Sequence, residues 1–168
     1  MSLQLETCFY TSVEVDANPG YREADHKVEC KVEINGELNF VNAHRLGASL
    51  SIAIAESDGM PYDIALFMFA GFTIHDDTLA QFANAGMLER ALDQYKNSAV
   101  SICYGAAREF VLMVTGRQPW GPFTLPVVYP STIELAITLG DEVKGLAKIS
   151  KRNALTPRAP KKKASKQK

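Results

Sequence analysis

The sequence predicts an α+β fold, in which a four-stranded antiparallel sheet is followed by a long helix, a crossover loop and a C-terminal helix. Apolar residues alternate with polar ones, or run continuously, in four segments typical of strands: residues 3–16, 28–34, 46–54 and 62–74. Residues 78–115 instead repeat their apolar side chains at helical spacing. Strands that all precede the helices favour a sheet with helices on one face.

The first two predicted strands each have one apolar face. In the first strand that face contains Leu3, Leu5, Phe9, Val13 and Val15. The strand ends at Asn18-Pro19-Gly20, because proline lacks an amide donor and glycine permits positive φ. Asn35-Gly36 follows the second strand. This pair is typical of a type I′ hairpin turn, and it also begins longer loops.

The fourth predicted strand differs from the third in being apolar on both faces. The third has one apolar face from Leu46 to Ile54, and Ser57-Asp58-Gly59-Met60-Pro61 forms the turn between them. In the middle of the fourth strand Phe67 and Phe69 oppose Leu66 and Met68. A strand that is apolar on both sides is usually covered on both sides. Since helices cover only one face, the pattern predicts that another subunit covers the second.

The helical half is predicted to contain three helices. The first begins at Asp76, Asp77 or Thr78, continues to Tyr95, and is weakened by Gly86. The second spans residues 97–115 and stops at Gly116. After a crossover rich in proline and aromatic residues, Ser131-Thr132-Ile133-Glu134 matches a capping box. It predicts a final helix whose inner face holds Ile133, Ile137, Leu139, Val143 and Leu146.

Composition indicates one cytoplasmic domain with a charged tail. The chain of 168 residues is long enough for a single core. Its longest apolar run, residues 64–74, is shorter than the roughly 20 residues that cross a bilayer, and we expect no secretory signal at its start. Cys8, Cys30 and Cys103 are widely spaced, which favours reduced thiols.

The charges are distributed unevenly along the chain. Residues 151–168 hold eight of the 18 Lys and Arg residues and none of the 19 Asp and Glu residues, so residues 1–150 carry a formal net charge of −9. We therefore expect a folded domain at residues 1–150 and a disordered basic tail at residues 151–168. The tail is either a solvated segment or a contact for RNA, the ribosome or anionic lipid.

No residue pattern indicates catalysis, a cofactor or a metal site. The sequence has no phosphate-binding loop, nucleophile elbow or paired carboxylates. His26, His44 and His75 lie in three separate segments without ligand spacing. Arg108 and Glu109 are adjacent in a helix and therefore point apart, which favours a structural role. We expect a protein that is not an enzyme, although an enzyme of unrecognised type on this scaffold is an alternative.

Between Leu46 and Ile133 the chain resembles the SecB family of protein-export chaperones. The resemblance rests on Ala70-Gly71-Phe72-Thr73-Ile74, on Ala107-Arg108-Glu109, and on Arg117 with the crossover to Phe123-Thr124-Leu125-Pro126-Val127. It implies a SecB-like fold, assembly as a homotetramer (a dimer of dimers), and binding of unfolded polypeptide in apolar grooves without ATP hydrolysis. The chain departs from the family at Gly105-Ala106, where Pro-Tyr is usual, and in its basic tail.

The resemblance implies three sets of functional residues. The client-binding set is Trp120, Phe123, Leu125, Tyr129 and Phe72. The four loop residues could instead only fix the crossover to the sheet, and Phe72 could belong to the core or to a subunit interface. An acidic sheet face for docking a translocase ATPase would contain Glu14, Asp16, Glu29 and Glu33. The oligomer interface would contain Tyr104, Arg108, Glu109 and Phe110.

Two other functional settings are compatible with the same residues. The chain could be a solitary, toxin–antitoxin-associated or phage-encoded SecB-like chaperone. Alternatively, it could be a nucleic-acid- or ribosome-binding adaptor that acts through the basic tail.

Overall fold

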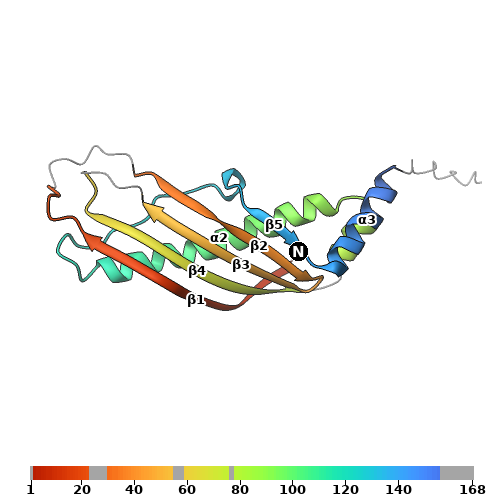
Figure 1. Cartoon of the computed structure of the whole chain (residues 1–168), viewed down its shortest axis with the longest axis horizontal. Helices are drawn as coiled ribbons and strands as arrows, with labels where there is room; N and C mark the ends of the chain where they lie inside the picture. Colours follow the sequence, from red (N-terminus) through yellow and green to blue (C-terminus); the bar gives the residue numbers. More distant parts are fainter. Residues whose placement is uncertain (1, 23–29, 55–58, 76–77, 156–168) are drawn as a thin grey trace, which may run out of the picture.

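The computed structural model describes residues 2–22, 30–54, 59–75 and 78–155 of an elongated molecule (Figure 1). A long helix runs along one face of a sheet, and a second helix lies at one end of the molecule. The sheet has five strands in the order β1-β4-β3-β2-β5. They are β1 (Ser2–Ala17), β2 (Val32–Asn42), β3 (Arg45–Ile54), β4 (Tyr62–His75) and β5 (Ala136–Leu139).

The first four strands pair antiparallel, as the sequence predicts. The predicted third and fourth strands correspond to β3 and β4. The fifth strand was not predicted, and it pairs parallel with β2. The α+β class is therefore confirmed, with one additional strand at the edge of the sheet.

Two irregularities in β1 change which side chains face the helix. The pairing with β4 shifts register between Leu5 and Thr7 and again between Tyr10 and Ser12. Each β-bulge moves the alternation by one residue. Tyr10 therefore packs on the helical side, whereas Phe9 lies on the opposite face beside Phe69, with ring centroids 5.4 Å apart. The prediction that Phe9 shares a face with Leu5 is wrong for this reason.

The second strand does not turn at Asn35-Gly36, so the hairpin and loop predictions at this pair are both wrong. β2 continues to Asn42, and the chain reverses at residues 43–44 before β3 begins. Gly36 lies opposite Leu50 with a φ of 154°, and a Cβ there would be 2.0 Å from the carbonyl oxygen of Ser49. Glycine is therefore needed for a close approach of two strands. Residues 28–29 of the predicted strand lie outside the described residues.

The helices divide at Gly86 and not near residue 96. α1 (Thr78–Asn84) is short, and α2 (Leu88–Thr115) is continuous across the predicted break. Gly86 has a φ of 72°, and a Cβ there would approach Ala154 to between 3.1 and 3.3 Å. α2 ends at the predicted residue, although Gly116 has a φ of −58° and keeps a helical conformation.

The predicted helix start at residues 131–134 is wrong. A short 3₁₀ turn, η2 (Pro130–Thr132), is followed by β5, in which Ile137 lies opposite Leu38. The unpaired edge of β2 accepts this segment as a strand. The amide of Gly140 then donates to the carbonyl of Phe40 at 2.7 Å. α3 (Asp141–Leu155) follows and extends five residues beyond the expected start of the tail, while residues 156–168 lie outside the described residues.

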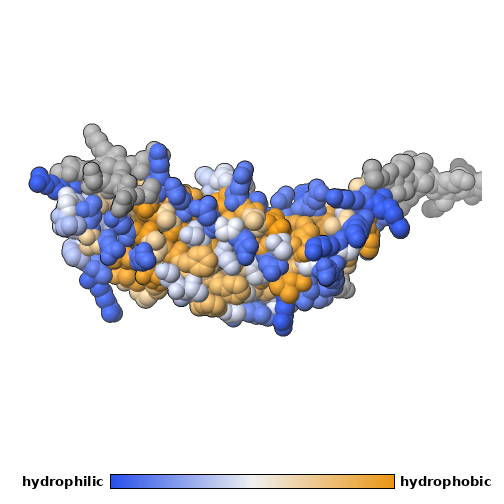
Figure 2. All heavy atoms as spheres, in the orientation of Figure 1, coloured by the Kyte–Doolittle hydropathy of each residue, from blue (hydrophilic) through white to orange (hydrophobic). Residues whose placement is uncertain are grey.

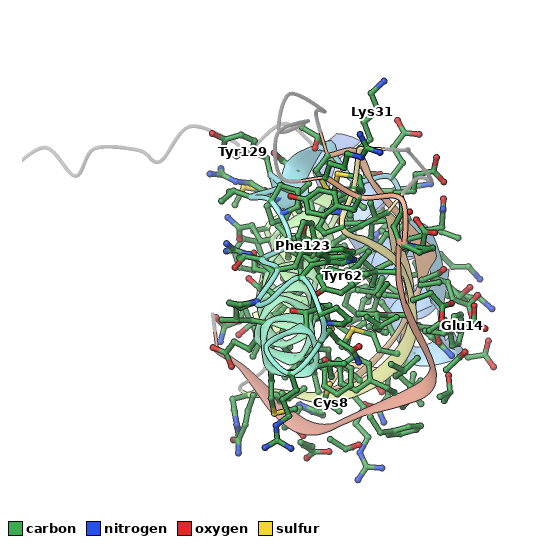
Figure 3. The ribbon with its side chains drawn as sticks, turned by 90° about the vertical axis from the view of Figure 1, so that its left-hand side faces the viewer. Cys8, Glu14, Lys31, Tyr62, Phe123 and Tyr129 are labelled. Carbon is green, nitrogen blue, oxygen red and sulfur yellow. The ribbon has the colours of Figure 1, made fainter. Side chains whose placement is uncertain are left out.

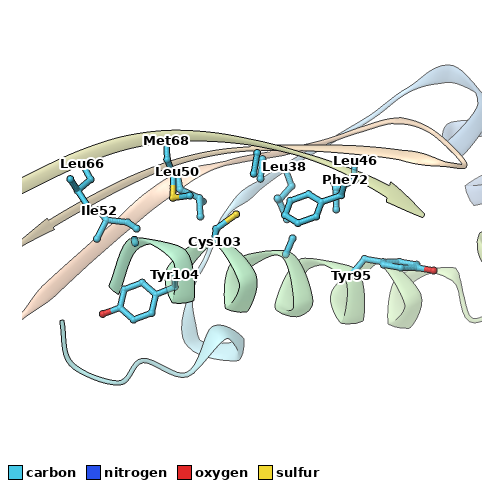
Figure 4. Packing of buried hydrophobic residues seen from close by; sticks show 14 of the residues in the cluster. Leu38, Leu46, Leu50, Ile52, Leu66, Met68, Phe72, Tyr95, Cys103 and Tyr104 are labelled. Carbon is cyan, nitrogen blue, oxygen red and sulfur yellow. The ribbon is translucent and has the colours of Figure 1, made fainter. Parts of the chain in front are cut away.

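The core lies between the sheet and α2 (Figure 4). Its largest fully buried side chains come from β2, β3 and β4, together with Tyr95 of α2 and Leu79 of α1. Burial raises the pKa of the Cys103 thiol, in the middle of α2, to about 12. On the other face of β4, Phe67 keeps 44% of its surface exposed. The two-sided apolar character of β4 is therefore real, and the described residues cover one side.

Candidate functional site

The crossover loop, residues 116–129, is attached to the start of β4 by one buried hydroxyl. Tyr62 is fully buried. Its hydroxyl donates to the carbonyl of Gly121 at 2.8 Å and accepts the amide of Trp120 at 3.1 Å. Both bonds are made to backbone atoms of the loop, so they fix its path independently of its side chains.

Two further attachments connect the loop to the end of β1 and to α2. The indole nitrogen of Trp120 donates to the carbonyl of Asn18 at 3.0 Å, just after β1 ends. The amide of Phe123 donates to the Thr115 hydroxyl at 2.8 Å, and that hydroxyl donates to Val111 within α2 at 2.7 Å. The loop is thus held by three separate elements of the fold.

A pocket of about 540 Å³ opens between the loop and the ends of the strands. The Phe123 ring lies edge-on to Tyr62, with centroids 6.2 Å apart, and Trp120 lies edge-on to Tyr21 at 5.5 Å. Figure 3 shows Tyr62 and Phe123 together between the loop and the sheet. Among the described residues the lining contains no charged side chain, and it consists of Tyr21, Cys30, Gly59, Met60, Pro61, Tyr62, Pro119, Trp120, Pro122 and Phe123.

The predicted client-binding residues do not form one group. Trp120 and Phe123 meet at this pocket. Tyr129 is 72% exposed and points away from it (Figure 3). Leu125 and Phe72 are buried in the core and have no surface to offer a client in this arrangement. The structure therefore places two of the five residues at the pocket, one on the surface away from it and two in the core.

Sequence reasoning missed the strand side of the pocket. Tyr62 looks like an ordinary first residue of a strand, and Met60 and Pro61 like turn residues. The antiparallel register that places Ala17 opposite Tyr62 brings the end of β1 beside them. No local pattern relates these residues to a loop about 60 positions later in the chain.

A smaller pocket of about 170 Å³ lies between α2 and the far end of the loop. The Tyr104 hydroxyl donates to the carbonyl of Pro126 at 2.8 Å, and Arg108 Nε donates to the carbonyl of Leu125 at 2.9 Å. Burial raises the pKa of Tyr104 to about 12, although the nearby Arg108 charge acts in the opposite direction. Val127, at its rim, is 71% exposed.

The residues expected at an oligomer interface are therefore largely occupied within the subunit. Tyr104 and Arg108 hold the loop of their own chain. Phe110 is half-buried and stacks on Tyr10 of β1, with ring centroids 4.2 Å apart. Of the four residues, only Glu109 is exposed.

The predicted acidic face lies on the side of the sheet away from α2. Glu14 and Glu33 end one row across four strands, Glu14–Ala65–Ala53–Glu33, and both are exposed. Asp16 is exposed as well and pairs across the strands with Asp63. Figure 3 shows Glu14 pointing outward from the sheet. Glu29 lies outside the described residues.

The described residues offer neither a metal-binding cluster nor a membrane-spanning helix. Among them, no three His, Cys, Asp or Glu residues are grouped so that they could hold a metal ion. In that same part of the chain, no helix combines the length and the apolar character needed to cross a membrane.

Comparison with known proteins gives a structural match only. No family model and no curated protein matches the sequence. The structure is similar to a SecB-like chaperone of Mycobacterium tuberculosis, solved with a ChAD peptide from the HigA1 antitoxin, with a TM-score of 0.52, 15% identity, and coverage of 75% of this chain and 90% of that one. A Streptococcus agalactiae protein of unknown function aligns with a TM-score of 0.41 at 15% identity, covering 76% and 98%. The chain therefore has the SecB-like fold.

Proposed function

We propose that this protein is an ATP-independent chaperone that binds unfolded polypeptides at the crossover-loop pocket. The observation that carries the proposal is the pocket of about 540 Å³, whose described lining includes aromatic residues, prolines and a methionine. This volume falls within the roughly 300–1,000 Å³ of typical ligand sites. The SecB-like fold supports the same function.

The chemistry of the pocket suits apolar side chains from many sequences. Folded proteins bury such side chains, so a pocket lined by aromatic residues, prolines and a methionine selects chains that expose them. Trp120 is the most accessible aromatic residue of the lining, with 42% of its surface exposed. Since Phe123 is half-buried and packs on the core, we assign it to the wall of the pocket.

The assembly we propose is a homotetramer built as a dimer of dimers. β1, 16 residues long, lies at the edge of the sheet, where a long unpaired strand readily pairs with another chain. On α2, Leu112 is 42% and Met113 65% exposed. Exposed apolar residues on a helix next to an open strand edge are consistent with burial against further copies.

The biological setting has two candidates. The comparison protein was solved with a peptide from an antitoxin, so antitoxin segments are one class of client that we propose. The acidic row at Glu14 and Glu33 supports the other setting, in which a translocase ATPase docks on the sheet during export.

The test is light scattering of a heat-sensitive protein, with and without the chain, combined with the mass of the chain from a sizing column. The proposal expects aggregation to be suppressed without ATP. Trp120→Ala should weaken suppression. The matched control is Met87→Ala, because Met87 has a similar exposure, 44% against 42%, and lies at the other end of α2 from the crossover loop.

The two variants distinguish client binding at the pocket from non-specific binding to exposed apolar residues. If both variants suppress aggregation as well as the wild type does, clients bind elsewhere. If both lose suppression to the same extent, the contact with clients is a non-specific apolar one. A monomer with no effect on aggregation would leave the likeness to the chaperone as one of fold alone. Circular dichroism of both variants shows whether the fold is intact.

A further inference from the structure

α3 carries a cationic stripe on its exposed face. Val143 and Ser150 are buried against the body, whereas four cations face outward. At 3.6 residues per turn they fall within an arc of about 100°. We name them the α3 stripe: Lys144, Lys148, Lys151 and Arg152. Lys144 forms an ion pair with Asp141 at 3.4 Å, and the helix contains no acidic residue after Glu142.

From the stripe onward, every charged side chain in the sequence is positive. From residue 144 to the end the sequence has ten Lys and Arg residues and no Asp or Glu. Residues 1–143 have eight basic and 19 acidic residues, a net charge of −11. Figure 2 shows hydrophilic side chains crowded at the end of the molecule that carries α3.

The acidic face of the same subunit is poorly placed to neutralise this charge. Ala154, near the end of α3, lies against Gly86 just before α2 begins. Asp16 is near Asn18, which contacts the loop that follows the other end of α2. The 28 residues of α2 span about 42 Å. The acidic face and the stripe therefore lie toward opposite ends of α2.

We propose that the α3 stripe binds the phosphate backbone of RNA. Cations that recur each helical turn on one line can follow successive phosphates of a strand. Most of the ten cations are lysines, and no aromatic residue lies among them, so the contact does not depend on base sequence. A lipid surface is less suitable, because stable membrane binding usually also needs an apolar face to insert.

The position of the stripe is compatible with simultaneous client binding. α3 packs beside α1 and the start of α2, while the crossover loop follows the end of α2. RNA at one end therefore leaves the pocket accessible. The choice of RNA among polyanions rests on the proposed function, because unfolded chains are most concentrated beside ribosomes, whose surface is largely RNA. A contact there raises the effective concentration of clients.

The experiment measures binding of the full chain to a fluorescent 30-nucleotide single-stranded RNA of mixed sequence, by anisotropy over a range of salt concentrations. The test variant is Lys148→Gln with Lys151→Gln, which removes two stripe cations and keeps the tail. Loss of two phosphate contacts should reduce the slope of log K against log salt by about 1.4. The matched control is Lys31→Gln with Arg45→Gln, two exposed cations, one just before β2 and one at the start of β3, which changes net charge equally and should keep the slope.

Three results would overturn the proposal. They are absence of RNA binding by the wild type at low salt, equal slopes for the test variant and wild type, and binding to anionic vesicles of phosphatidylglycerol and phosphatidylcholine without binding to RNA. A chain that ends at Leu155 should bind RNA more weakly but measurably. Aggregation suppression should be unchanged in the test variant, so that failure of this proposal is distinguishable from failure of the chaperone function.

Discussion

Removal of one hydroxyl group should release the crossover loop while leaving the core in place. Tyr62→Phe keeps the ring that packs in the core and against Phe123. It deletes the oxygen that donates to Gly121 and accepts the amide of Trp120. The change is therefore confined to the attachment of the loop to β4.

The size of the effect follows from two hydrogen bonds made by a fully buried residue. Each contributes roughly 0.5–1.5 kcal/mol net. Loss of both should favour loop opening by about 2 kcal/mol, which is about 30-fold in the opening equilibrium. The loop keeps its attachment to Thr115 through Phe123, so we expect local opening without global unfolding.

Hydrogen exchange of the loop measures this opening directly. Peptides that cover residues 118–124 should exchange about 30-fold faster in Tyr62→Phe, while peptides from β3 should exchange at the wild-type rate. Trp120 is the single tryptophan of the chain, so acrylamide quenching reports the same change. Tyr129→Phe is the control, because Tyr129 is 72% exposed and lies away from the pocket. Wild-type exchange in both variants would show that the hydroxyl does not hold the loop.

Two further predictions concern stability. Gly36→Ala should lower the free energy of unfolding by about 1–3 kcal/mol, because the added Cβ would be 2.0 Å from a backbone oxygen. Gly105→Ala should raise the free energy of unfolding by up to about 1 kcal/mol, because a Cβ there has nothing within 4 Å. Urea titration measures both, and equal values would contradict the packing argument. Burial raises the pKa values of Cys103 and Tyr104 to about 12, so the unfolded chain loses these protons first. The melting temperature should therefore fall as pH rises from about 9 to 12. In Cys103→Ala it should fall less steeply. Parallel curves for this variant and the wild type would show that the thiol does not contribute to the pH dependence.

The predictable parts of the fold are those with one unbroken period. β3 and β4 follow their alternation from end to end, and α2 ends where Gly116 interrupts a helical repeat. In β1 the alternation is interrupted twice by bulges. A bulge leaves no mark on composition, so Phe9 was placed with the apolar residues of the other face.

Turn and capping signals failed where a neighbouring strand offered better partners. Asn35-Gly36 is a strong local turn signal, but Ile34 and Leu38 on either side both pair with β3. The segment with Ile133 and Ile137 has helical spacing, yet it adds to the free edge of β2 as β5. A single sequence does not reveal which sheet edge is open, and tertiary pairing overrides these local preferences.

The candidate site was predictable by location and not by orientation. The family resemblance pointed to the crossover as the client-binding segment, and Trp120 and Phe123 line the pocket beside it. Leu125 and Tyr129 come from the same segment, but one is buried and the other exposed. An irregular loop has no period that assigns its side chains to the inside or the outside.

The attachments of the loop explain how one pocket could hold many different clients. Tyr62 and Thr115 bind backbone atoms of the loop, so these contacts do not use the side-chain surfaces that a client would touch. Pro119 and Pro122 restrict φ on either side of Trp120. A loop fixed in this way loses little conformational entropy when a client binds, which leaves more of the apolar contact energy for affinity. Under the proposed function, selectivity for unfolded chains would then come from the aromatic and proline-rich lining and not from adaptation of the loop to each sequence.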